Sequence, residues 1–128
     1  MKTYEGRRRF FATRVTVDGR SLRFRRDLRC HSPAEFEWGY GGSGPAQLAL
    51  AILADHLGDD EQALNLYQRF KWAVIAGLPR HCWRLTGHQI DQALQSIREQ
   101  DADGQNSMTV DCLQHGKEVH HGCSLHDL

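Results

Sequence analysis

Two pairs of cysteine and histidine near the end of the chain have the spacing that a zinc ion prefers. Each pair places a thiol and an imidazole three residues apart, and both groups are common zinc ligands. The four predicted ligands are Cys112, His115, Cys123 and His126. The gap between the pairs is shorter than in common zinc fingers, and few apolar residues surround them. The pattern predicts at most one zinc ion, and the alternative is a disordered tail that carries histidines.

A glycine-rich turn precedes the most apolar run of the chain. It consists of Gly41, Gly42, Ser43 and Gly44. Free N–H groups at the start of a helix attract anions, so this turn is a candidate anion-binding site. No lysine follows in the position of a P-loop, and the glycines do not match the dinucleotide fingerprint. The alternative is that the glycines serve tight backbone geometry alone.

Basic residues are concentrated at the start of the chain. Residues 1–29 hold ten Lys or Arg against three acids, a net charge of +7, whereas residues 101–128 hold one against five. Clustered guanidinium groups pair with phosphates and carboxylates, so this segment is a candidate surface for an anionic partner. The predicted partner-binding residues are Arg7, Arg8, Arg9, Arg14, Arg23, Arg25 and Arg26. The alternative is a solvated strand face whose charges discourage edge-to-edge pairing.

The arginines are compatible with two kinds of partner, a nucleic acid backbone or an acidic protein surface. Tyr4, Phe10 and Phe11 lie nearby in the sequence and are able to stack on bases, although they are equally suited to a core. A protein partner is the first expectation, and a nucleic acid is the second.

No set of residues in the sequence indicates catalysis. Cys30 stands next to His31, but a nucleophile also needs a third group that orients the base, and none is evident. We expect a protein that is not an enzyme and that has no cofactor, unless the tail holds zinc.

The elements that must position these groups are organised around one buried helix, predicted from Ser43 to Leu57. Its residues are almost wholly apolar, Ser43 is the expected N-cap, and Gly58 is the expected C-terminal glycine. Upstream, Phe36, Trp38 and Tyr40 alternate with smaller or polar residues. This alternation predicts three rings on one side of an extended segment.

Alternating β-branched and aromatic residues predict a sheet at the start of the chain. Strands are expected at 2–6, 12–17 and 21–24, with Asp18-Gly19 as the turn of a hairpin. Arg23 and Arg25 are expected to share a face of the third strand. Together with the arginines before the turn, they would give the sheet one basic face.

Two further helices complete the predicted fold. One begins at Asp59 to Glu61 and ends before Gly77, and the other runs from Thr86, with Gln89 at the capping-box distance, to Gln100. Trp83 to Leu85 is expected as a short extended piece between them. The fold class is α+β, with a three-stranded antiparallel sheet packed on about three helices.

The chain of 128 residues fits one domain, expected at residues 1–100, followed by an acidic and flexible tail at 101–128. The longest apolar helix is too short to span a bilayer, and no apolar run follows the first residues. The four cysteines are too widely spaced for a small secreted framework. We therefore expect a cytoplasmic protein without a membrane segment.

Three stretches of this sequence resemble a family of small bacterial and archaeal proteins that is catalogued as a domain of unknown function. They are FEWGYGGSGPAQLALAILADHLGD, which contains the signature FEWGYGGSGPAQLALAIL, then YQRFKWAVIAGLP, and then W-x-L-T-G. The resemblance spans roughly residues 1–97. The members of this family look like proteins that are often encoded on phages, plasmids and other mobile elements. The resemblance implies no activity and no site residue.

These observations favour a small binding protein that engages a macromolecular partner. The resemblance to products of mobile elements makes an inhibitor of bacterial defence, similar to an anti-CRISPR protein, its concrete form. One alternative is a nucleic-acid-binding accessory protein. Another is a zinc-dependent regulator that acts through the tail.

Overall fold

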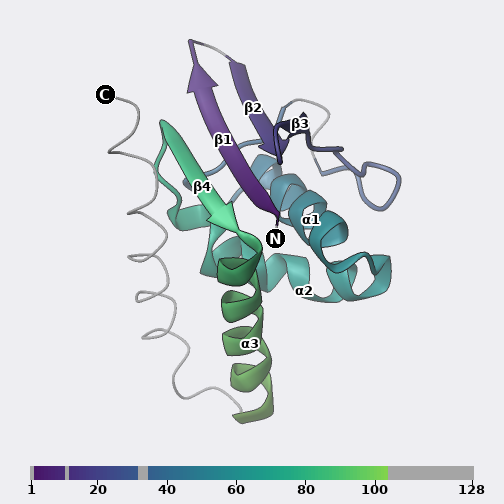
Figure 1. Ribbon diagram of the computed structural model, residues 1–128. Helices are drawn as coiled ribbons and strands as arrows, with labels where there is room; N and C mark the ends of the chain where they lie inside the picture. Colours follow the sequence, from purple (N-terminus) through teal and green to yellow (C-terminus); the bar gives the residue numbers. More distant parts are fainter. Residues whose placement is uncertain (1, 11, 32–34, 104–128) are drawn as a thin grey trace.

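The computed structural model describes residues 2–10, 12–31 and 35–103, with only the backbone described at 101–103. Four strands form one antiparallel sheet in the order β3-β2-β1-β4. The strands are β1 (Thr3–Arg9), β2 (Ala12–Val17), β3 (Arg20–Ser21) and β4 (Cys82–Thr86). Figure 1 shows the hairpin of β1 and β2 projecting beyond the helices. The α+β class is confirmed.

The sheet has four strands instead of the three expected from the sequence. The extended piece around Trp83 is β4, which pairs with β1 so that Gly6 lies opposite Trp83 and Tyr4 opposite Leu85. Gly6 is required at this position, because a Cβ there would lie 2.3 Å from the Trp83 indole. A pairing between residues so distant in the sequence leaves no local signal, which is why β4 was expected only as an extended piece.

The third strand is shorter than predicted. The turn at Asp18-Gly19 is confirmed, and both residues have positive φ angles, 50° and 84°. The strand then ends at Ser21, although the Leu22 N–H still donates to the Val15 carbonyl at 3.0 Å. Arg25 has a φ of 58°, which turns the chain away from the sheet. The prediction that Arg23 and Arg25 share a strand face is therefore wrong.

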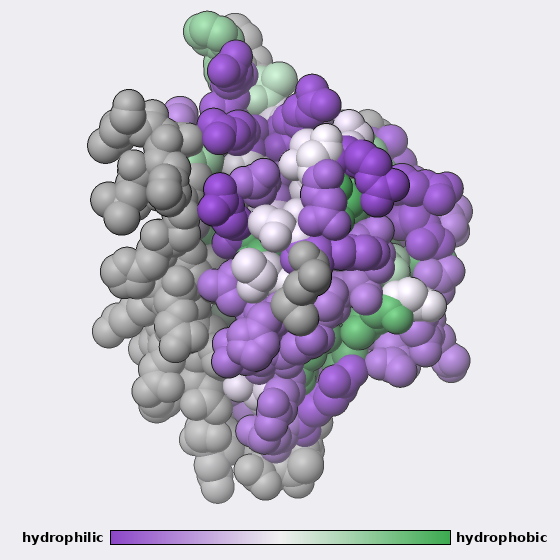
Figure 2. Space-filling model, viewed as in Figure 1, coloured by the Kyte–Doolittle hydropathy of each residue, from purple (hydrophilic) through white to green (hydrophobic). Residues whose placement is uncertain are grey.

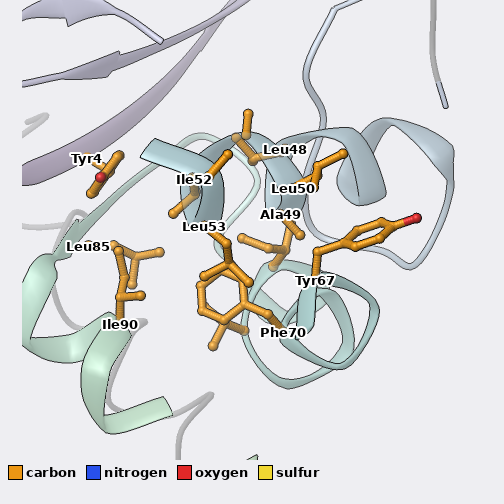
Figure 3. Close-up of a cluster of buried hydrophobic side chains, with 14 of the residues drawn as sticks. Tyr4, Leu48, Ala49, Leu50, Ile52, Leu53, Tyr67, Phe70, Leu85 and Ile90 are labelled. Atoms are coloured by element: carbon orange, nitrogen blue, oxygen red, sulfur yellow. The ribbon is translucent and has the colours of Figure 1, made fainter. Parts of the chain in front are cut away.

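The helices are α1 (Ser43–Leu57), α2 (Asp60–Ala73), the short 3-10 helix η1 (Ile75–Gly77) and α3 (Gly87–Asp103). α1 is buried along eleven consecutive residues, from Gly44 to Ala54, as its apolar sequence predicted. Figure 3 shows it between Tyr4 and Leu85 of the sheet on one side and Phe70 of α2 on the other. α3 continues past the end expected at Gln100.

The helix ends confirm two of the three predicted caps. Gly58 ends α1 in the left-handed conformation, with a φ of 65°. Thr86 and Gln89 form the capping box, since each backbone N–H donates to the side-chain oxygen of the other residue. The predicted cap at Ser43 is wrong. The helix already includes Ser43, so the N-cap position falls on Gly42, which has no side-chain oxygen.

The aromatic segment before α1 packs as predicted at two of its three rings. Phe36 and Trp38 are buried, and the Trp38 and Trp83 rings meet edge to face at 5.6 Å between centroids. Tyr40 is 49% exposed, because the chain turns at Gly39, where φ is 88°. No helix within the described part of the chain is long and apolar enough to cross a membrane.

Candidate partner-binding surface

Four of the seven predicted arginines lie on the β1–β2 hairpin, and the structure divides them between its two faces. Arg7, Arg9 and Arg14 are exposed, on the opposite side of the sheet from the buried Tyr4 and Val15. Arg7 lies opposite Arg14 in the ladder, so these two side chains share a face. Arg9 is two residues from Arg7 on the same strand and therefore points the same way. Three guanidinium groups gather near the end of the hairpin.

A hollow of about 380 Å³ lies among these three arginines. The described residues that line it are Arg7, Arg9, Ala12, Thr13 and Arg14. Positive charges held close together repel one another, and an anion between them removes that repulsion. Guanidinium groups also donate two parallel hydrogen bonds to a carboxylate or a phosphate. The chemistry of the hollow therefore suits an anionic group.

The tip of the hairpin presents an apolar ring to solvent. Phe10 is 95% exposed and has a φ of 53°, the left-handed conformation that the tight turn requires. Figure 2 shows apolar atoms at the top of the molecule above a hydrophilic surface. Exposed aromatic side chains and arginines are both enriched in protein–protein interfaces. We call Arg7, Arg9, Phe10 and Arg14 the hairpin face.

The side of the sheet that carries the hairpin face is mixed in charge away from the tip. Glu5 forms an ion pair with Arg84 of β4 at 3.0 Å. Asp18, at the far end of the hairpin, accepts a hydrogen bond from the Thr3 N–H at 2.9 Å. The hollow near the tip, in contrast, has no acid among the described residues that line it.

Arg8 points to the other face of the sheet and takes part in the fold. Its guanidinium donates to both carboxylate oxygens of Glu37, at 2.7 and 3.1 Å, and its Nε donates to the Arg80 carbonyl at 3.0 Å. The guanidinium also lies 4.9 Å from the ring centroid of Trp38. These hydrogen bonds raise the pKa of Arg8 and lower the pKa of the Glu37 carboxyl.

The remaining predicted arginines follow β3 in the loop toward α1. Arg25 donates to the carboxylates of Asp27 and Asp60, each at 3.0 Å, and these hydrogen bonds raise its pKa. Arg26 lies over the Phe24 ring at 4.2 Å. Arg23 is exposed. These three residues are separate from the hairpin face, and their role in partner binding stays a prediction.

The glycines of the predicted anion-binding turn are packed under side chains. A Cβ on Gly41 would lie 2.1 Å from the Trp72 ring, and one on Gly42 would lie 2.4 Å from the Tyr40 ring. Gly44 is buried, and a Cβ there would lie 2.7 Å from the Glu37 Cβ. The aromatic rings account for two of these glycines. The use of the turn, including the exposed Ser43, for anion binding stays a prediction.

His31 is held by two hydrogen bonds from α1 and α2. Its backbone N–H donates to the Gln47 Oε1 at 2.8 Å, and its Nε2 lies 2.6 Å from the Tyr67 hydroxyl oxygen. Burial lowers the pKa of His31, and the positive charges of Arg29 and Lys71 lower it further. Cys30 is exposed. The pair therefore has a structural explanation in the attachment of the loop to the helices.

The predicted zinc ligands, Cys112, His115, Cys123 and His126, lie outside the described residues. The part of the chain that the structure describes contains no group of three or more potential metal ligands.

Sequence reasoning missed two residues that shape the region around the site. Gln47 is fully buried in α1, where its Nε2 donates to the Phe24 carbonyl at 2.7 Å and fixes the loop. Its polar character within an apolar helix is a signal that was available. Glu37, which pairs with Arg8, stands among aromatic residues and was also available as a signal. Gln47 ties the loop to α1, and Glu37 ties the segment before α1 to β1.

Comparison with known proteins gives a family and no function. No curated protein and no solved structure matches the chain. The model of one family, described as a family of unknown function (DUF6166), matches residues 4–96, which include the hairpin face and end within α3. The chain therefore belongs to this family of unknown function, DUF6166.

Proposed function

We propose that the chain is a non-enzymatic binding protein that engages an acidic surface of a partner protein through the hairpin face. One observation carries the proposal: Arg7, Arg9 and Arg14 surround a single hollow, next to a phenyl ring that is 95% exposed. Carboxylates fit the hollow, and an apolar pocket of the partner fits the ring. The family match is compatible with this proposal but assigns no activity.

The distribution of charge favours a protein partner over a nucleic acid. A nucleic acid presents a continuous row of phosphates, which would meet Glu5 and Asp18 on the same hairpin. An acidic protein surface needs only a local match with the three arginines. In addition, the basic and acidic residues of the whole chain are equal in number, so no net charge attracts a polyanion.

The concrete form that we propose is an inhibitor of bacterial defence. It rests on the resemblance of this sequence to products of mobile elements, which is an association and not a property of the site. A small basic hairpin with an aromatic tip is suited to occupying a site on a larger protein. The size and exposure of the hairpin face support a binding role, and the resemblance alone supports the role of an inhibitor.

The proposal is tested by capture of partners from a bacterial host lysate with the full-length protein, with and without nuclease. The key variant combines Arg7→Glu with Arg9→Glu. The control combines Arg69→Glu with Arg98→Glu, which makes the same change in net charge on α2 and α3. We expect the wild type to capture one dominant protein, and we expect nuclease treatment not to reduce this capture. The hairpin variant should lose the captured protein, whereas the control variant should retain it.

Two outcomes would contradict the proposal. Equal capture by the hairpin variant and the wild type at about 0.15 M salt, where screening reaches roughly 8 Å, would move the site away from the hairpin face. Capture that disappears after nuclease, together with direct binding to random DNA or RNA that falls steeply with salt, would replace the protein partner with a nucleic acid.

A further inference from the structure

Half of β2 has an open edge on the side away from β1. β3 pairs only with Thr16 and Val17, and the Leu22 N–H adds one more bond to the Val15 carbonyl. From Ala12 to Arg14 the described residues place β1 on one side of β2 and no strand on the other. Of these three residues only Thr13 turns its backbone groups toward this edge, because those of Ala12 and Arg14 face β1. An edge without a neighbouring strand is a place that another strand is able to join.

A groove of about 530 Å³ follows this open edge. The described residues that line it are Ala12, Thr13, Arg14, Val15, Ser21, Leu22, Phe24, Glu35 and Phe36. Its apolar part includes the Phe24 and Phe36 rings, which are stacked with centroids 4.0 Å apart. Arg14 is exposed on the side of the groove that continues into the hairpin face. The groove thus has an apolar wall, a basic rim and a strand edge.

A carboxylate already occupies the hydrogen-bonding position of a missing strand. The Thr13 N–H donates to the Glu35 Oε1 at 3.1 Å, and the Thr13 hydroxyl donates to the Phe36 carbonyl at 2.6 Å. Backbone groups two residues apart face the same edge, so the Thr13 N–H points to the side on which Val15 bonds to Leu22. The Glu35 oxygen stands in for the carbonyl oxygen of a neighbouring strand.

We infer that this groove takes an extended segment of a partner protein, which lies along β2 from Ala12 to Arg14 and pairs with it at Thr13. The carbonyl of the segment replaces the Glu35 carboxylate at the Thr13 N–H, and Glu35, which is exposed, turns to solvent. Side chains alternate along a strand, so one set lies against Leu22 and Phe24 and the other lies beside Arg14. The segment therefore alternates apolar and acidic residues.

The charge of the rim supports the acidic set. Arg14 lines the groove and is exposed, and release of Glu35 from the edge removes the acid that faces the groove. The inference goes beyond the proposed function, because it uses the backbone edge and the apolar wall and does not need Arg7 or Arg9. Both surfaces include Arg14, so one partner is able to contact both.

The test uses a capped hexapeptide of alternating aspartate and valine and the full-length protein labelled with 15N. We expect saturable binding with the largest amide shifts at Thr13, Glu35 and Phe24. Glu35→Ala removes the competing acceptor and should tighten binding by about three- to tenfold, the equivalent of one hydrogen bond. Glu99→Ala, which removes an exposed acid from α3, should leave the affinity unchanged.

Two control peptides separate strand addition from simple charge attraction. The same peptide with alternate backbone nitrogens methylated, on the edge that would face β2, should not bind. A peptide of alternating lysine and valine should bind at least tenfold more weakly. The Arg7→Glu and Arg9→Glu variant should still bind the aspartate–valine peptide, so failure of the proposed function and failure of this inference are distinguishable.

Three results would overturn the inference. One is the absence of amide shifts at about 1 mM peptide with both the wild type and Glu35→Ala. A dissociation constant well above about 1 mM would mean that the groove is not a specific site for this peptide. Another is equal binding of the methylated and unmethylated peptides, which would show that charge attraction and not strand pairing causes the binding. The last is dimerisation of Glu35→Ala in sedimentation, which would make a second copy of this chain the occupant.

Discussion

Arg8 and Arg9 are neighbours in the sequence and lie on opposite faces of the same strand. Arg8 is held by the Glu37 carboxylate and the Arg80 carbonyl on the face that meets the helices. Arg9 is exposed and lines the hollow on the other face. The alternation of a strand assigns the two guanidinium groups to different roles although their residue type is the same.

A basic run in a sequence is therefore not the same as a basic surface. Of the arginines predicted to bind a partner, Arg8 and Arg25 already have carboxylate partners within the fold. Arg9 and Arg14 face the hollow instead. The layer beneath the sheet holds the inner face of the hairpin through Arg8, and the outer face carries the proposed binding site.

The largest expected effect belongs to the buried layer. Leu50 is fully buried in α1, so Leu50→Ala should reduce the free energy of unfolding by about 2–5 kcal/mol, because truncation leaves a cavity that the core cannot fully close. Urea denaturation followed by circular dichroism measures the loss. A midpoint equal to that of the wild type would show that α1 does not support the sheet.

The next largest effect separates the neighbouring arginines. Arg8→Ala should reduce the free energy of unfolding by about 1–3 kcal/mol, because the partly buried Glu37 carboxylate loses a two-point hydrogen bond. Arg9→Ala is the matched control and should change it by less than about 0.5 kcal/mol. Partner capture should show the reverse order. Equal losses of stability in the two variants would remove the distinction between the faces.

The sequence was sufficient for the helices because their signals are local. The apolar run of α1, the capping box at Thr86 and Gln89, and the glycine at Gly58 each depend on residues within one or two turns. The position of β4 was not predictable in this way. It depends on the match between the missing side chain of Gly6 and the ring of Trp83, which is a contact between distant parts of the chain.

The candidate site was predictable in composition but not in arrangement. The excess of arginine is visible in the sequence, but the side on which each arginine lies depends on the register of β1 and β2. The groove beside β2 depends on the early end of β3, for which the left-handed Arg25 gives no residue-type signal. Glycine or asparagine would have marked such a position, and arginine does not.

The response to acid offers a further test of the inner ion pair. Arg8 lowers the pKa of Glu37 below the ordinary value of 4.5, so the stabilisation is complete above about pH 4.5 and is lost as the pH falls through the folded pKa. The pKa of Asp27 is lowered by Arg25 in the same direction. Both carboxylates therefore contribute to the loss of stability in acid. The contribution of Glu37 is the difference between the loss in the wild type and the loss in Arg8→Ala. We expect the variant to lose less stability between pH 5 and pH 3. Parallel curves would show that the pair is not formed in solution.

The smallest expected effect concerns the loop that carries Arg25. The Arg25–Asp60 ion pair joins this loop to the first turn of α2, and both acids of that turn, Asp60 and Glu61, also interact with the helix dipole. Asp60→Asn loses the ion pair and the dipole interaction, whereas Glu61→Gln loses the dipole interaction alone. The difference between the two variants should be about 0.2–1 kcal/mol, the size of an exposed ion pair. Because exposed charges are screened, the difference should shrink when the salt concentration rises from about 0.05 to about 0.5 M. A difference that is independent of salt would mean that Asp60 acts on the start of α2 and not through Arg25, and the loop would then depend on Gln47 for its attachment to the buried layer.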